Sequence, residues 1–226
     1  MDASKTIVAV AGATGRTGSL IVKELFQKGY GVRGLVRSSA RGAWIKDLGG
    51  EIVEADITSP ESVEHAVEGV DFIISALGSK KPFSPQEDNR VDNMGIQNLA
   101  RAAKKKGIKH IAVVSSIGVG DSSSGLPFIL RLLMGPVLRT KAKSEAAVKS
   151  CGVGYTIIRP GALTDNPASG NVAFGEGGKI NGRISRADIA RVCVDALTNH
   201  AMKNRVFEVV DAATVKEARR PFIIKI

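Results

Sequence analysis

Short apolar runs alternate with segments of helical periodicity along almost the whole chain. The apolar runs predict strands at 6–11, 32–37, 51–55, 72–76, 110–114, 155–158 and 206–210. The segments between them predict helices at about 16–28, 40–48, 60–68, 86–106, 139–150 and 186–198. In the last of these, apolar residues recur at the spacing that forms one buried stripe on a helix.

This alternation indicates the fold class. Strands that are apolar on nearly every residue are typical of a parallel sheet covered on both faces by helices. We therefore expect an α/β fold, a Rossmann-like doubly wound parallel sheet of about seven strands. With 226 residues, 43% of them hydrophobic, the chain can bury a full core in one domain spanning 1–226. The pattern does not place residues 212–226.

Membrane insertion and secretion are not expected from the sequence. No run approaches the roughly 20 apolar residues of a membrane-spanning helix, and the nearest, 126–138, contains Pro127, Arg131 and Pro136. The first strand begins too early for a signal peptide to precede it. We expect a reducing cytoplasmic, stromal or matrix location, with earlier removal of a transit peptide left open. Cys151 and Cys193 predict reduced core thiols, without a metal site.

A net charge of +10, from 32 Lys and Arg against 22 Asp and Glu, raises the question of a nucleic-acid or anionic membrane partner. The cations are spread along the chain. The densest group, at 104–109, lies where a predicted helix ends, and cations suit that end of the helix dipole. Aromatic residues make up only 4% of the chain, too few for base stacking. We expect no nucleic-acid partner.

The clearest motif is a glycine-rich turn between the first strand and the first helix. Gly12, Gly15 and Gly18 have the spacing G-x-x-G-x-x-G. In a dinucleotide pocket the first glycine allows a sharp turn, the second allows backbone N–H groups to approach the pyrophosphate, and the third allows close helix packing. The alternative is an ordinary glycine-rich turn. We expect coenzyme contacts from this turn, including its residues Thr14, Arg16 and Thr17.

The end of the second strand indicates which coenzyme is bound. NAD-binding chains of this design carry an acidic residue there, which holds the ribose hydroxyls. This chain has Arg37 and Ser38, followed by Arg41. A guanidinium holds a phosphate by two parallel hydrogen bonds, so the sequence predicts NADP(H), with Arg16 as a further cation. The alternative for Arg37 is a solvated cation at a strand end.

Two later strand ends add candidate contacts. Asp56 and Ile57 follow the third strand, where a carboxylate and a backbone N–H can meet the adenine edge; alternatively, Asp56 only starts a turn. Ala76, Leu77 and Gly78 end the fourth strand. Small residues at such a strand end suit a backbone that passes over a coenzyme.

Together these motifs resemble one family. They are 8–18, 35–37, Asp56, 75–78, 113–116 and 155–161. Over about 5–211 the chain resembles the atypical short-chain dehydrogenase/reductases, and most closely the small NAD(P)-binding group that contains biliverdin reductase B, a flavin reductase. The resemblance implies NADP(H) along the carboxyl ends of the strands, with a small substrate cleft beside the nicotinamide. Asp92, Gly95 and Asn98 look like part of the family's long central helix.

The resemblance also implies residues near the nicotinamide. Ser116 occupies the position of the family's catalytic serine, unless it only caps a turn. Lys141, with Glu145 four residues later, resembles the family's catalytic lysine and would bond the nicotinamide ribose; the alternative is an exposed helix lysine. The remaining contacts that we expect with the coenzyme come from Ser115, Pro160, Gly161, Ala162 and Leu163.

One departure from the family is chemical. The tyrosine that precedes the lysine by four positions is replaced by Val137, and valine cannot transfer a proton. We therefore expect an NADPH-dependent reductase of a small acceptor such as a flavin, quinone or conjugated carbonyl, because hydride transfer belongs to the coenzyme. The alternative is a non-catalytic NADP(H)-responsive regulatory or assembly protein.

Two segments carry further expectations. The apolar stretch 125–138 fits a substrate lid packed on the core, or a helix that faces a protein partner. Ser185 and Asp188 form the capping-box pattern at the start of the last helix, to which we assign no chemistry. The oligomeric state is left open.

Overall fold

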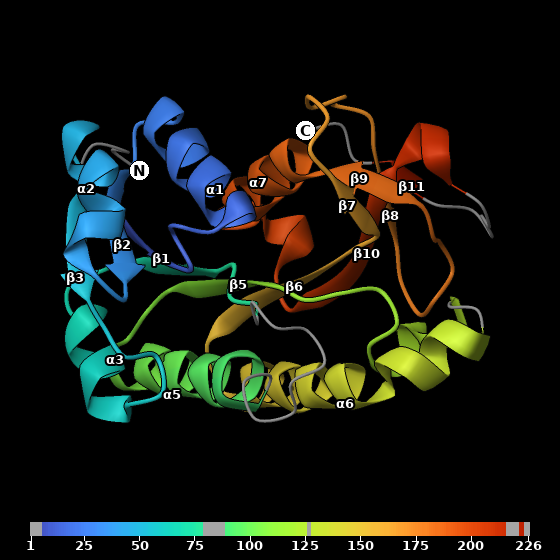
Figure 1. Ribbon diagram of the computed structural model, residues 1–226, viewed down its shortest axis with the longest axis horizontal. Helices are drawn as coiled ribbons and strands as arrows, with labels where there is room; N and C mark the ends of the chain where they lie inside the picture. Colours follow the sequence, from blue (N-terminus) through green and yellow to red (C-terminus); the bar gives the residue numbers. More distant parts are fainter. Residues whose placement is uncertain (1–5, 79–88, 126–127, 216–221, 224–226) are drawn as a thin grey trace.

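The computed structural model describes residues 6–78, 89–125, 128–215 and 222–223, and its largest element is a nine-stranded sheet (Figure 1). The strand order is β11-β8-β10-β6-β5-β4-β1-β2-β3. The strands predicted from the sequence are β1 (Ile7–Ala11), β2 (Gly31–Val36), β3 (Glu51–Glu54), β4 (Phe72–Ser75), β5 (His110–Val114), β6 (Gly154–Pro160) and β10 (Arg205–Asp211). All of them run parallel, which confirms the predicted fold class.

Helices cover both faces of the sheet. On one face lie α1 (Arg16–Gln27) and α7 (Arg186–Asp195); on the other lie α3 (Pro60–Ala66), α5 (Ile96–Lys105) and α6 (Phe128–Ser150) (Figure 1). Helix α2 (Ser39–Asp47) packs beside β2 and β3. Since alternate residues of each strand face opposite ways, β1 contributes Val8 and Val10 to one core and Ala9 and Ala11 to the other.

Four further strands were not predicted. β8 (Val172–Gly175) and β11 (Phe222–Ile223) extend the sheet beyond β10, with β8 antiparallel to both of its neighbours. β7 (Ala162–Thr164) and β9 (Arg183–Ser185) form a separate two-stranded sheet. Each is at most four residues long, too short to show a period of its own.

The structure corrects one helix boundary. The helix predicted at 139–150 begins at Phe128 and continues through Pro136. Proline has no N–H to donate, yet Val137 and Leu138 directly after it are buried, and their burial favours helix on both sides of Pro136. Most of the apolar stretch 125–138 is therefore the first half of α6. In the helix predicted at 86–106, residues 86–88 lie outside the described residues, and the rest begins as the π-helical segment η2 (Asn89–Gly95) before α5.

Three short 3₁₀ segments lie in the described ranges: η3 (Gly120–Gly125), η4 (His200–Met202) and η5 (Ala212–Thr214). A buried histidine ties η4 to the sheet. His110, the first residue of β5, lies with its Nε2 3.0 Å from Thr156 Oγ1, while the Thr156 hydroxyl donates to the carbonyl of Met202 at 2.8 Å. Because that hydroxyl proton is already used, the ring nitrogen is the donor. Burial, with the nearby charge of Lys203, lowers the pKa of His110 from 6.5 to about 4.

This histidine predicts a pH dependence of stability. As the pH falls from 6.5 towards 4, the unfolded chain binds a proton that the folded chain excludes, so the free energy of unfolding falls by about 3 kcal/mol. Urea unfolding at pH 7 and pH 4.5 measures the loss. His110→Asn should flatten this slope, whereas His200→Asn, at an exposed position, should retain it. An equal slope in both variants would contradict the assignment.

Candidate functional site

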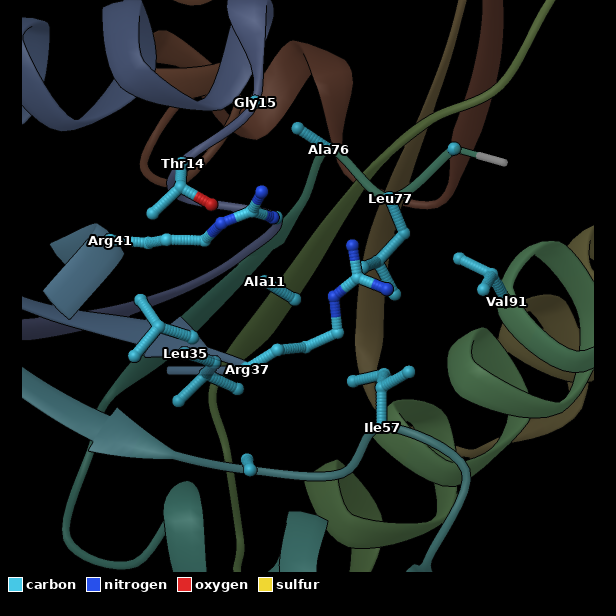
Figure 2. A pocket seen from close by; sticks show the side chains of 14 residues that line it. Ala11, Thr14, Gly15, Leu35, Arg37, Arg41, Ile57, Ala76, Leu77 and Val91 are labelled. Atoms are coloured by element: carbon cyan, nitrogen blue, oxygen red, sulfur yellow. The ribbon is translucent and has the colours of Figure 1, made fainter. Parts of the chain in front are cut away.

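A cleft opens at the carboxyl ends of β1, β2 and β4 (Figure 2). In an open α/β sheet, ligands bind at this edge, where the strand order reverses, which here is between β1 and β4. The cleft holds about 820 Å³, including its mouth. Its lining residues are Ala11, Gly12, Thr14, Gly15, Leu35, Val36, Arg37, Arg41, Ala55, Ile57, Ala76, Leu77, Gly78 and Val91.

The glycine turn forms one wall of the cleft. Gly12 has a φ of +79°, a conformation that favours glycine, and a Cβ there would lie 2.8 Å from the carbonyl oxygen of Ala76. A Cβ on Gly18 would overlap the carbonyl oxygen of Gly12. These contacts confirm the predicted sharp turn and close helix packing. Gly15 is less constrained, so its role in pyrophosphate approach stays a prediction.

The start of α1 is chemically suited to a pyrophosphate. Its N-cap is Gly15, which offers no side-chain hydrogen bond, whereas Ser59 and Ser185 cap α3 and α7 with their side chains. The first N–H groups of a helix have no partner within the helix, and its dipole favours an anion there. The N-terminus of α1 can therefore bind an anion without displacing a side-chain cap.

Arg37 and Arg41 bring two positive charges to the opposite wall. Figure 2 shows both side chains extending across the cleft from the end of β2 and the first turn of α2. Within the described part of the chain, neither has a carboxylate oxygen within 4 Å, whereas Arg33 and Arg186 are ion-paired. Guanidinium groups without a carboxylate partner are suited to binding an anion such as a phosphate.

Several predicted coenzyme contacts do not line this cleft. The Arg16 side chain pairs with Asp165, and Thr17 and Gly18, in the first turn of α1, are not among the lining residues. Ser38 is the N-cap residue of α2. Asp56 accepts hydrogen bonds from the backbone and hydroxyl of Thr58, which hold its pKa below the usual value. The turn role of Asp56 is therefore present, while its contact with adenine stays a prediction.

The two candidate catalytic residues are held by different partners. The Ser116 hydroxyl donates to the carbonyl of Ile117 at 3.0 Å. Lys141 Nζ lies 2.7 Å from Asp92 Oδ1, with the two side chains only 14% and 2% exposed. The alternative of an exposed helix lysine is therefore wrong. Asp92 comes from the π-helical segment η2, and such segments are frequent at functional sites.

A buried ionic network lies beside Lys141, one turn further along α6. Glu145 accepts the Ser115 hydroxyl at 2.6 Å and two hydrogen bonds from Arg159, at 3.0 and 2.7 Å. Arg159 also pairs with Asp121 and lies 3.9 Å from Glu208. Because the carboxylate fixes the Ser115 side chain, this residue has one defined orientation.

Glu208 connects this network to the loop before β9. Its carboxylate accepts the N–H groups of Gly178 and Lys179 at 2.8 and 3.2 Å, and burial raises the pKa of the Glu208 carboxyl. Sequence reasoning did not predict the network. The one feature of the sequence that could have indicated it is a charged residue within each of two apolar strands, Arg159 in β6 and Glu208 in β10.

The predicted contacts Pro160, Gly161, Ala162 and Leu163 run from β6 into β7. The amides of Gly161 and Ala162 donate to the carbonyls of Val209 and Gly182, each at 3.0 Å. A Cβ on Gly161 would overlap the Gly182 carbonyl oxygen. This segment is fixed at the carboxyl edge of the sheet, and its coenzyme contacts stay predictions.

A second groove lies between η3 and α6, close in sequence to both Ser116 and Lys141. It holds about 650 Å³ and is lined by Gly118, Gly120, Ser123, Gly135, Leu138, Arg139 and Ala142.

Cys151 and Cys193 are buried and unbonded, as expected. In the described ranges no group of three His, Cys, Asp or Glu side chains is placed to hold a metal ion. Nor does any helix there have the length and apolarity to cross a bilayer.

Comparison with known proteins identifies the coenzyme class. Residues 12–200 match the family described as NAD(P)H-binding. The chain belongs to this family. The match confirms the predicted nicotinamide coenzyme and agrees with the resemblance to atypical short-chain dehydrogenase/reductases.

Individual relatives of this NAD(P)H-binding protein differ in activity. Sanguinarine reductase of Eschscholzia californica is 36% identical over 252 residues, covering 92% of this chain and 90% of the relative. The photosystem II assembly factor Ycf39 of Cyanophora paradoxa is 32% identical over 152 residues, covering 67% of this chain and 44% of Ycf39. A putative NAD-dependent epimerase/dehydratase from Bacillus halodurans has a TM-score of 0.81 at 27% identity, covering 92% of this chain and 94% of that one.

Proposed function

We propose that this single-domain protein is an NADPH-dependent reductase of a small organic acceptor. The observation that carries the proposal is the pair of unneutralised guanidinium groups of Arg37 and Arg41 in the cleft. They would hold the 2′-phosphate that distinguishes NADPH from NADH, while the N-terminus of α1 would hold the pyrophosphate. The bound coenzyme supplies the hydride. Sanguinarine reductase, a relative of similar length, supports the assignment as a reductase.

The absence of a catalytic phenol limits which acceptors the protein can reduce. Val137 occupies the position of the family's tyrosine and is buried. The two tyrosines of the chain, Tyr30 and Tyr155, lie at the amino ends of β2 and β6, the sheet edge opposite the cleft. Neither can donate a proton to an acceptor at the carboxyl edge. Flavins, quinones and conjugated carbonyls fit best, because they take up hydride with little help from an enzymatic acid.

We infer that the acceptor binds in the groove between η3 and α6. Glycines and Ala142 form much of its lining, so a flat ring can approach the backbone closely. Ser115 and Lys141, each held by a carboxylate partner, would orient the nicotinamide end of the coenzyme. We infer that these two residues position the reactants and that the polypeptide contributes orientation to the reaction.

The test is NADPH oxidation with a panel of riboflavin, a short-chain quinone and a conjugated enone. We expect turnover above the uncatalysed rate with at least one acceptor, and a lower rate with NADH at equal concentration. A matched reaction with the Arg37→Ala, Arg41→Ala variant should lose most of the NADPH-dependent rate. Tight NADPH binding without turnover of any acceptor would contradict the reductase and leave the second candidate.

That second candidate is an NADP(H)-responsive assembly protein. The buried Val137 in place of an acid and the similarity to the assembly factor Ycf39 favour it. Captured partners that change between NADPH and NADP⁺ would support this function. Identical partners with and without nucleotide would count against it.

A further inference from the structure

A carboxylate is bonded to the strand-to-helix junction that carries the two arginines of the cleft. Glu54 is the last residue of β3 and is paired in register with Val36, the residue before Arg37. Its Oε1 accepts the backbone N–H of Ser39, the first residue of α2, at 2.6 Å. Hydrogen bonds from the hydroxyl and amide of Ser39 lower the pKa of Glu54. Glu54 is therefore ionised at neutral pH.

The charge of Glu54 does not neutralise Arg37 or Arg41. Ser39 lies between Arg37 and Arg41 in sequence, so its partner Glu54 is bonded to the segment that carries both. Neither guanidinium has a carboxylate oxygen within 4 Å in the part of the chain that the structure describes. The carboxylate is thus fixed to the segment that carries both cations without forming an ion pair with either.

We propose that Glu54 is a specificity-determining residue that limits the preference of this protein for NADP(H) over NAD(H). The inference rests on the proposed NADPH site. A 2′-phosphate held by Arg37 and Arg41 would be repelled by the Glu54 carboxylate. The ribose hydroxyl of NAD(H) at the same place carries no charge. Glu54 therefore weakens binding of one coenzyme and leaves the other unchanged.

The size of the effect follows from the exposure of the site. Glu54 is exposed, so water screens its charge and the repulsion is moderate. Removing the charge should tighten NADPH binding by roughly three- to tenfold. The gain should shrink as ionic strength rises, since the Debye length falls to roughly 3 Å at 1 M salt. A change in helix capping alone would not distinguish NADPH from NADH, because a charge at a helix N-terminus is also screened by salt.

The experiment compares Glu54→Gln with Glu51→Gln. Glu51 is an exposed carboxylate at the other end of the same strand and is paired with Arg33, so its variant removes an equal charge farther from the cleft. Isothermal titration with NADPH and NADH, at low and at high salt, gives the four affinities for each protein. For E54Q we expect the tighter NADPH binding described above and NADH affinity within about twofold of wild type. For E51Q we expect the affinities for both coenzymes to stay within about twofold of wild type.

Each other outcome has a distinct meaning. If E54Q weakens the binding of both coenzymes equally, Glu54 only stabilises the start of α2 and the inference is wrong. If the coenzyme affinities of E54Q equal those of E51Q, the charge of Glu54 does not affect binding in the cleft and the inference is also wrong. The proposed function is judged separately, from the NADPH to NADH affinity ratio of the wild-type protein, whereas the inference is judged from the change in that ratio. Failure of the wild type to bind either coenzyme overturns both.

Discussion

Replacing Arg37 and Arg41 together with alanine should weaken NADPH binding by roughly a hundredfold or more and change NADH binding by less than about threefold. Each guanidinium makes charge-assisted hydrogen bonds to a phosphate, and such bonds contribute roughly 1.5–3 kcal/mol each. NADH has no 2′-phosphate, so it loses none of these bonds. Titration calorimetry with both coenzymes measures the difference.

Two further variants identify the cause of the loss. Arg37→Lys keeps the charge but not the planar fork, so its NADPH affinity should fall between wild type and Arg37→Ala. Arg191→Ala removes an exposed cation from α7, on another part of the surface, and should leave both affinities unchanged. An equal loss of affinity for NADPH and for NADH in the double variant would contradict the assignment. It would mean that the arginines bind a part common to both coenzymes.

The sequence was sufficient to predict the half of the site that is built locally. Gly18 packs against Gly12, and Gly12 packs against Ala76, the residue directly after β4, so the motif and the strand ends determine the geometry. Arg37 follows β2 directly and Arg41 lies in the first turn of α2, so their proximity also follows from the local sequence. Local spacing and strand periodicity determine these positions.

The rest of the site depends on contacts that spacing does not encode. Lys141 and Asp92 are 49 residues apart in sequence, and Arg159 and Asp121 are 38 apart. Whether a helix lysine is exposed or paired depends on which element packs opposite it. The same reason explains α6, where burial of Val137 and Leu138 outweighs the local preference of Pro136 to end a helix. Short strands such as β7 and β9 form only because they pair with each other.

The buried network gives the largest expected change in stability. Arg159→Met should lower the free energy of unfolding at pH 7 by about 3–5 kcal/mol, because removing one partner of a buried ion pair leaves the other charge uncompensated. Here two carboxylates lose compensation, since the side chains of Glu145 and Glu208 are 4% and 1% exposed. Lys105→Met is the control: it breaks a more exposed pair with Glu64 and should cost less than about 1 kcal/mol.

The pH dependence of the loss tests its electrostatic origin. Burial already raises the pKa of Glu208 above 4.5, although the charge of Arg159 opposes the shift; without that guanidinium the pKa of Glu208 rises further. Above pH 4.5 the unfolded carboxyl releases its proton while the folded one retains it, so the deficit of Arg159→Met grows with pH. Urea unfolding should therefore give a smaller deficit at pH 5 than at pH 7. Adding Glu208→Gln should recover part of the stability at pH 7, and it allows the measurement if the single variant does not fold there. A deficit that is equal at both pH values and unchanged by Glu208→Gln would show that Arg159 stabilises the fold by packing alone.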